Sequence, residues 1–143
     1  MRAYLDSCFL IYGMERRQPF ADWVDRQFAD LAAARASLVV SELTRLECRV
    51  GPIALGLDNV LADYDDFFSG ARLIWQPISR NVFELATELR ARHRIKTPDA
   101  LHLAAAMTAG CERFLTNDAR LRTAAGGKLD VVCFDGQANR EEP

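Results

Sequence analysis

The sequence predicts a three-layer α/β/α domain in which a mainly parallel, five-stranded sheet lies between helices. Short apolar segments typical of buried strands alternate along the chain with longer segments of helical periodicity. This alternation is typical of parallel sheets whose two faces are covered by helices. The chain has 143 residues, of which 50% are hydrophobic. That length suits a single domain with one substantial core.

The first half of the chain is expected to hold two short strands and three helices. Apolar residues that recur every three or four positions predict the helices, and compact apolar runs predict the strands. Ser41 is a good N-cap, and Gly51-Pro52 is expected to end the helix that Ser41 begins. The elements are a strand at 2–5, a helix at 19–34, a strand at 37–40, a helix at 41–51 and a helix at 53–68.

The second half is expected to add three strands and three helices. Thr97 suits an N-cap, with Pro98 at the first helical position and Gly110 after the last. The elements are a strand at 72–75, a helix around 82–89, a helix at 98–109, a strand at 113–116, a short helix opened by Asn117-Asp118 and a strand at 130–134. Residues 1–135 therefore form the expected domain, and residues 136–143 form a polar tail.

Carboxylates fall where these elements meet. Asp6 follows the first strand, Asp118 follows the fourth, and Asp99 opens a helix, while Glu42 and Glu47 lie on the helix that leaves the second strand. Ligands of parallel sheets bind outside the carboxyl ends of the strands, which is the edge where these acids are expected. Each acid alone also fits a turn, a helix start or the surface. Their coincidence at one edge favours a shared site.

Converging carboxylates repel one another unless a cation lies between them. Oxygen ligands of this kind suit Mg²⁺ or Mn²⁺, and such an ion commonly acts on phosphate esters. Zinc is disfavoured, because the four cysteines form no CxxC pair and are expected to be buried, reduced thiols. His93 and His102 have no nucleophile nearby in the pattern, and His102 is expected to be a packed helix residue. The residues therefore indicate metal-dependent phosphoester chemistry.

Several other classes lack their signatures. The chain has no P-loop, no dinucleotide-binding glycine motif and no nucleophile elbow. The paired acids and late lysine of a phospho-acceptor receiver domain are also missing. The net charge of −2 argues against a basic nucleic-acid coat protein. Apolar runs far shorter than about 20 residues and an N-terminus unlike a signal peptide predict a cytoplasmic protein without a membrane span.

The segments that carry the acids resemble the signature of PIN-domain proteins, and most closely that of VapC-type ribonuclease toxins of toxin–antitoxin pairs. The resemblance extends from residue 1 to about 134. It is carried by Tyr-Leu-Asp-Ser at 4–7, Val-Ser-Glu-Leu-Thr-Arg-Leu-Glu-Cys-Arg-Val-Gly at 40–51, Thr-Pro-Asp-Ala-Leu-His-Leu-Ala at 97–104 and Phe-Leu-Thr-Asn-Asp at 114–118.

The resemblance implies hydrolysis of single-stranded or looped RNA at an acidic pocket that holds Mg²⁺ or Mn²⁺. By motif position the catalytic acids are Asp6, Glu47, Asp99 and Asp118, with Asp6, Asp99 and Asp118 on the metal. Glu47 has the family's usual spacing to a following glycine, here Gly51. A helical wheel alone cannot choose between Glu47 and Glu42, so Glu42 stays an alternative. Thr116 and Asn117 resemble residues that support the last acid. Arg120 stands where many relatives have another acid, so that corner is less acidic.

The resemblance also implies partners. A VapC-type toxin is inhibited by a small antitoxin, here expected to insert Arg or Lys near the acids, and homodimers are usual. Phe67 and Phe68 are candidates for a dimer surface, or else for the core. The basic cluster between Arg90 and Lys96 is either an RNA backbone contact or a solvated loop. The alternatives are a non-catalytic PIN module that binds RNA or protein, and a housekeeping PIN nuclease.

Overall fold

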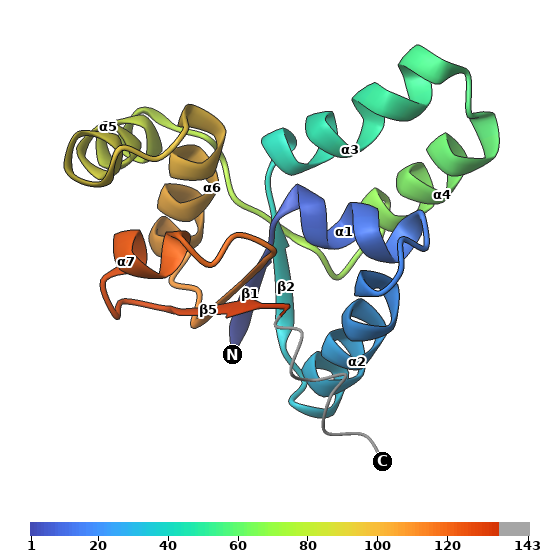
Figure 1. Cartoon of the computed structure of the whole chain (residues 1–143), viewed down its shortest axis with the longest axis horizontal. Coiled ribbons are helices and arrows are strands. Elements are labelled where there is room, and N and C mark those ends of the chain that lie inside the picture. The colour runs from blue at the N-terminus through green and yellow to red at the C-terminus, as the bar shows by residue number, and fades with distance from the viewer. Residues whose placement is uncertain (135–143) are drawn as a thin grey trace.

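The protein is an α/β domain with an all-parallel, five-stranded sheet, as the sequence predicts (Figure 1). This computed structural model describes residues 1–134, and the predicted tail at 136–143 lies outside the described residues. The strand order is β3-β2-β1-β4-β5. The strands are β1 (Arg2–Leu5), β2 (Ser37–Val40), β3 (Ile74–Trp75), β4 (Arg113–Thr116) and β5 (Asp130–Cys133).

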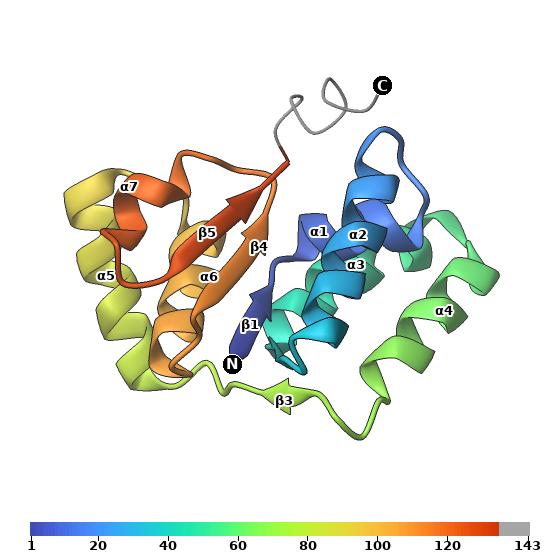
Figure 2. The same cartoon turned by 90° about the horizontal axis from the view of Figure 1, so that it is seen from below.

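The helices form two layers, with α1 to α4 on one face of the sheet and α5 to α7 on the other (Figures 1 and 2). None of the helices in residues 1–134 is both long and apolar enough to cross a membrane. Their bounds are α1 (Ser7–Met14), α2 (Phe20–Ala33), α3 (Glu42–Leu55), α4 (Asp58–Phe68), α5 (Arg80–His93), α6 (Thr97–Thr108) and α7 (Leu121–Ala125).

The central strand β1 contributes to the core on both faces of the sheet. Ala3 and Leu5 pack with the α1–α4 layer, whereas Tyr4 packs with the α5–α7 layer. This alternation follows from the two-residue period of a strand. Tyr4 also stacks on Phe114 of β4, with ring centroids 5.4 Å apart. Because both faces of β1 are covered, the residue that follows it is held in a fixed position.

The helix boundaries near residues 51–58 differ from the prediction. α3 continues through Pro52, which is buried, and ends at Gly56, which has a positive φ of 68°. Proline fixes φ near the helical value, so here it fails to end the helix. Glycine adopts the left-handed conformation at little cost, so Gly56 ends it instead. The predicted helix at 53–68 is thereby divided, and only residues 58–68 form α4.

Three further helix starts also differ. α1 is missing from the prediction, and Asp6 is its N-cap. α6 begins with Lys96 as N-cap rather than Thr97, because a proline is accepted throughout the first turn of a helix. α7 begins only at Leu121, since the side chain of Asp118 accepts a hydrogen bond from the backbone N–H of Arg120 and forms a turn there.

The two aromatic residues proposed for a dimer surface lie at the end of α4. Phe68 is buried in the core beside Trp75, with ring centroids 5.7 Å apart, and Phe67 is half-buried. The core interpretation therefore holds for Phe68.

Candidate active site

The four predicted acids line one pocket at the carboxyl edge of the sheet. Asp6 follows β1 and Asp118 follows β4, and these strands are neighbours in the sheet. The strand order changes direction between them, which is where parallel sheets form their binding crevices. Glu47 reaches the pocket from α3 and Asp99 from α6. This acidic pocket has a volume of about 510 Å³.

Asp6 is held firmly at the base of the acidic pocket. It is 5% exposed and caps α1, with one carboxylate oxygen accepting a 2.8 Å hydrogen bond from the backbone N–H of Ser7. The other oxygen accepts a 2.7 Å bond from the hydroxyl of Thr116. Asp6 also donates its own backbone N–H to Leu115, at 3.0 Å. The end of β1, the start of α1 and the end of β4 thus fix this carboxylate together.

The orientation of α3 gives the two candidate glutamates different surroundings. Its start is fixed by a capping box in which Ser41 and Thr44 bond to each other's backbone N–H. In that orientation Glu47 lines the acidic pocket, whereas Glu42 in the first turn is exposed. The structure therefore brings Glu47 to the other acids and leaves Glu42 away from them.

A buried polar network lies beneath Asp6 and Glu47, and His102 is its centre. His102 is 1% exposed. Its Nε2 bonds to the carboxylate of Glu47 and lies 3.6 Å from Asp6. Its Nδ1 lies 2.7 Å from the hydroxyl of Tyr4, which also bonds to Ser41 at 2.8 Å. His102 is thus packed in the helix, as predicted, and is also bonded to the candidate site.

Sequence reasoning missed this role of His102, although two signals were present. His102 lies three residues after Asp99, so both side chains are on one face of α6. Tyr4 lies two residues before Asp6 on β1. Neither spacing reveals that Glu47 comes from another helix to complete the network.

Charge balance in this network favours an ion pair. Burial disfavours the charged forms of both Glu47 and His102. Their hydrogen bond and opposite charges outweigh that effect, so the pKa of Glu47 lies below its usual value and the pKa of His102 above it. The protein thereby supplies one cation to its own acidic pocket.

Asp99 and Asp118 differ in how their charges are balanced. Burial raises the pKa of Asp99, and the negative charges of Asp6 and Asp118 raise it further. Asp118 instead forms a two-point ion pair with Arg120, at 2.9 and 2.7 Å, and this contact lowers the pKa of Asp118. Arg120 therefore neutralises this corner of the pocket.

The predicted supporting residues lie beside these acids. Besides its bond to Asp6, the hydroxyl of Thr116 accepts a hydrogen bond from the backbone N–H of Asp118 at 3.3 Å. Asn117 lines the acidic pocket and donates to the hydroxyl of Tyr12 at 2.9 Å. Thr116 therefore connects two of the acids, and Asn117 forms part of the opposite wall.

Residues 3–127 match the family model described as PIN domain. The chain belongs to the PIN-domain family. A search of the curated proteins finds no match for this PIN domain.

Solved structures similar to this PIN domain come from toxin–antitoxin complexes. VapBC2 from Rickettsia felis, bound to a DNA fragment from its promoter, aligns with a TM-score of 0.75 at 18% identity over 94% of this chain and 100% of that chain. DNA-bound VapBC from Salmonella typhimurium aligns with a TM-score of 0.71 at 18% identity, over 93% of this chain and 98% of that chain. A toxin–antitoxin complex from Klebsiella pneumoniae aligns with a TM-score of 0.65 at 22% identity, over 91% of this chain and 95% of that chain. At these identities the likeness establishes the fold.

The donor set of this PIN domain fits a hard divalent cation. Carboxylate oxygens of Asp6 and Glu47 lie within 4.8 Å of each other, and Asp99 and Asp118 face the same pocket. His102 lies within the same distance, but as the cationic partner of Glu47 it is not counted as a ligand. Carboxylate oxygens suit Mg²⁺ or Mn²⁺. Cys8 lies at the edge of the pocket, where burial raises its pKa to about 12. Most of the donor atoms in this pocket are therefore carboxylate oxygens.

Proposed function

We propose that this PIN domain is a metal-dependent endoribonuclease and the toxin of a toxin–antitoxin pair, acting in the cytoplasm on single-stranded or looped RNA. The observation that carries the proposal is the meeting of Asp6, Glu47, Asp99 and Asp118, from four separate parts of the chain, in one pocket. Carboxylates gathered in this way repel one another and are stabilised by a cation. The pKa of Asp99 is raised first by burial and then by the negative charges of Asp6 and Asp118.

Each residue has a defined part in the proposed reaction. Asp6, Asp99 and Asp118 would hold the ion, with Glu47 completing its surroundings or orienting the attacking water. When bound, Mg²⁺ or Mn²⁺ neutralises the phosphate and activates water for attack on phosphorus. His102 holds the carboxylate of Glu47, and Thr116 holds that of Asp6, so neither carboxylate must be ordered when RNA binds. Hydrolysis would leave a 5′-phosphate and a 3′-hydroxyl.

Glu47→Gln is expected to impair RNA cleavage far more than Glu42→Gln. The first change removes a charge that lines the acidic pocket, and its loss is expected to lower kcat/KM about 100-fold. The second lies on the same helix but is exposed, so activity is expected to stay within about twofold. The measurement is cleavage of structured RNA by purified protein with Mg²⁺, with Mn²⁺ and with EDTA.

The same assay separates the proposed nuclease from its alternatives. Equal losses of activity in the Glu47 and Glu42 variants would show that the assignment of Glu47 as the second acid is wrong. RNA binding without cleavage in any divalent cation would instead identify a non-catalytic PIN module. Cleavage that persists in EDTA would contradict metal dependence.

The partner proposal is supported by similarity to toxin–antitoxin complexes and by an exposed apolar stripe. Leu46, Val50 and Ile53 lie on one side of α3 and are 60%, 58% and 56% exposed. Trp23 on α2 is only 4% exposed and offers a partner little surface, so the α3 stripe is the better candidate. It lies on the helix that carries Glu47, which lets one antitoxin cover the stripe and place a cationic side chain in the acidic pocket. A homodimer is also proposed for this protein.

Val50→Asp is expected to weaken binding of a copurified antitoxin about 30-fold, as for a central contact of an interface. Phe83→Asp is the matched control, because Phe83 is 52% exposed but lies on α5 in the other helical layer. The measurement is purification from the native host at low salt, followed by titration of the separated partner. A toxic, active protein without any tightly bound partner would favour a housekeeping nuclease. Loss of self-association alone in Val50→Asp would assign the stripe to the homodimer.

A further inference from the structure

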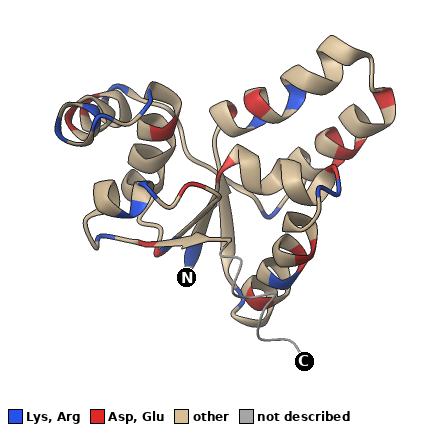
Figure 3. Cartoon of the chain, viewed as in Figure 1, with Lys and Arg blue, Asp and Glu red and all other residues tan. Residues whose placement is uncertain are grey.

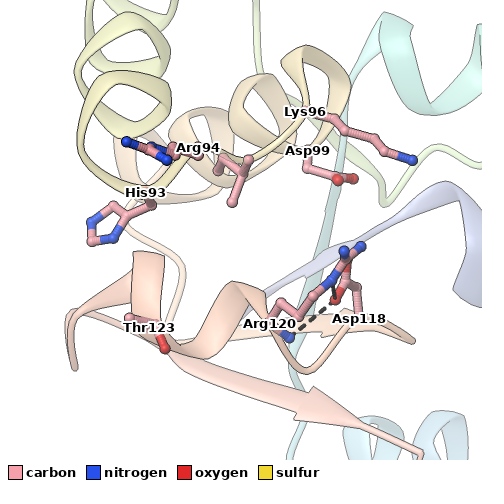
Figure 4. Close-up of a pocket in the computed structure, with 8 residues that line it drawn as sticks. His93, Arg94, Lys96, Asp99, Asp118, Arg120 and Thr123 are labelled. Carbon is pink, nitrogen blue, oxygen red and sulfur yellow. Dashed lines mark hydrogen bonds and ion pairs between the residues drawn. The ribbon is translucent and has the colours of Figure 1, made fainter.

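A second, smaller pocket opens directly beside the acidic pocket. It has a volume of about 210 Å³, and it shares Lys96, Asp99, Asp118 and Arg120 with the acidic pocket. Figure 4 shows it between two walls, the loop from α5 to α6 above and the connection from β4 to α7 below. The acids lie at one end and His93 at the other. A strand that leaves the acidic pocket on this side would enter it.

Three cationic side chains, those of Arg94, Lys96 and Arg120, line this second pocket, and His93 lines it beside them. We call these four residues the basic groove. Figure 3 shows basic residues, among a few acidic ones, at α5 and the loop after it. Not all of them face the groove, because the Nε of Arg90 bonds to the carbonyl of Ile95 at 2.9 Å. The part of the cluster nearest Asp99 is the part turned toward the site.

The backbone at Arg94 contributes to this placement. Arg94 is the C-cap of α5 and has a positive φ of 55°, a left-handed conformation that turns the chain from α5 into α6. Non-glycine residues rarely adopt it, and glycine would be favoured there on conformational grounds alone. The chain instead keeps an exposed arginine on the wall of the groove.

Arg120 lies at the boundary between the two pockets. Its side chain is 77% exposed, and it uses Nε and one Nη to bind Asp118. A guanidinium has five N–H donors, so others remain for a ligand. Phosphate accepts paired donors from arginine in the same planar geometry as carboxylate. Arg120 can therefore contact a phosphate while it remains bonded to Asp118.

The opposite wall of the acidic pocket has a different character. It is formed by Ser7, Cys8, Tyr12 and Asn117, which carry no positive charge. The chain as a whole has a net charge of −2, so it offers RNA no general attraction. Cations close to the acids are thus gathered on the groove side among the residues that line the two pockets.

We propose that the basic groove binds the backbone phosphate adjacent to the one cleaved, through Arg94, Lys96 and Arg120. The ligand is a phosphodiester of single-stranded RNA, and the contact holds the strand so that the next phosphate lies among the acids. The proposal names the substrate contact of the proposed nuclease and so rests on that function. It also explains how a protein with an acidic pocket retains a polyanion.

The test is binding of a short fluorescein-labelled oligouridylate in EDTA, measured by anisotropy over a series of salt concentrations. The groove variants are Arg94→Gly, which suits the left-handed backbone, and Lys96→Gln. The controls are Arg35→Gly and Lys128→Gln. Arg35 has nearly the same conformation, with φ of 52°, and both control residues are exposed just before strands β2 and β5, at the opposite edge of the sheet from the acids.

Each groove variant is expected to lower affinity about tenfold, the effect of a lost charge-assisted hydrogen bond. The slope of log affinity against log salt is expected to fall by about 0.7 for each lost phosphate contact. The controls should change neither quantity. Equal losses in groove and control variants, unchanged affinity in the groove variants, or no binding by the wild-type protein would overturn the proposal.

Because EDTA removes divalent cations, this result does not depend on cleavage. If the groove variants lose RNA binding but the wild-type protein cleaves no RNA, the groove proposal stands and the nuclease proposal fails. If the protein cleaves RNA with a metal ion and the Arg94 and Lys96 variants bind and cleave as the wild type does, the nuclease proposal stands and the groove proposal fails. Asp6→Asn serves as an internal check, since it removes negative charge from the acidic pocket and should leave binding in EDTA equal or tighter.

Discussion

Asp6→Asn is expected to abolish RNA cleavage while the protein remains folded. Asp6 is the most buried of the four acids, and its carboxylate is positioned by Ser7 and Thr116. Loss of one ligand charge is expected to remove about 4 kcal/mol of transition-state stabilisation, which corresponds to about a thousandfold in kcat/KM. Asparagine caps helices as well as aspartate does, so the free energy of unfolding should change by less than about 1 kcal/mol.

The matched control is Asp130→Asn, because Asp130 is exposed at the start of β5, at the other edge of the sheet. Cleavage rates and thermal unfolding curves are measured for both variants and for the wild-type protein. Asp99→Asn is expected to behave like Asp6→Asn, with equal or higher stability in EDTA because Asp99 is relieved of its repulsion. Normal cleavage by either variant would contradict the assignment of the site.

His102→Ala is expected to have the largest effect on stability. The change leaves a cavity beneath the site, removes a buried partner of Tyr4 and leaves Glu47 without its imidazole. Together these losses are expected to cost about 3 kcal/mol of unfolding free energy. For a domain of this size that lowers Tm by roughly 10 °C. The measurement is thermal unfolding, with and without Mn²⁺.

Leu103→Ala separates a structural role of His102 from a positioning role. Leu103 is the next residue of α6 and is fully buried, but it lies in the apolar core. Both variants are expected to lose stability. Only His102→Ala should also weaken the stabilisation by Mn²⁺, because Glu47 is then free to turn away from Asp6. If Mn²⁺ raises the Tm of both variants equally, His102 has only a packing role and does not position Glu47.

Much of the fold could be predicted because local patterns in this chain agree with the final structure. The five strands are short apolar runs, and the amphipathic helix α2 lies close to its predicted bounds. α5 was predicted around 82–89 but extends beyond both ends, to Arg80–His93. The errors arose where one local signal competed with another. Gly51-Pro52 suggested a stop, but the buried face of α3 continues to Pro52 and its left-handed end is at Gly56. α1 was not predicted because its residues are mostly apolar and show no helical periodicity.

Some features of the candidate site could be predicted from the sequence, and others depend on contacts that the sequence pattern does not reveal. Motif position selected the four acids and preferred Glu47, and the structure places all four on one pocket, while their catalytic role stays a prediction. The bond of His102 to Glu47 joins residues 55 positions apart, and periodicity within either helix contains no information about it. The ion pair of Asp118 with Arg120 depends on the local turn after β4, which composition does not specify.

The order of the acids along the chain bears on when activity can first arise. Asp6 and Glu47 emerge early in synthesis, whereas Asp99 and Asp118 follow much later. β1 is central in the sheet, and its neighbour β4 is made only after α6. A nascent chain therefore exposes two acids without the other two, and the pocket cannot close until β4 has docked beside β1. For the proposed nuclease, synthesis of the chain would therefore delay any activity until β4 and Asp118 have been made, late in the domain.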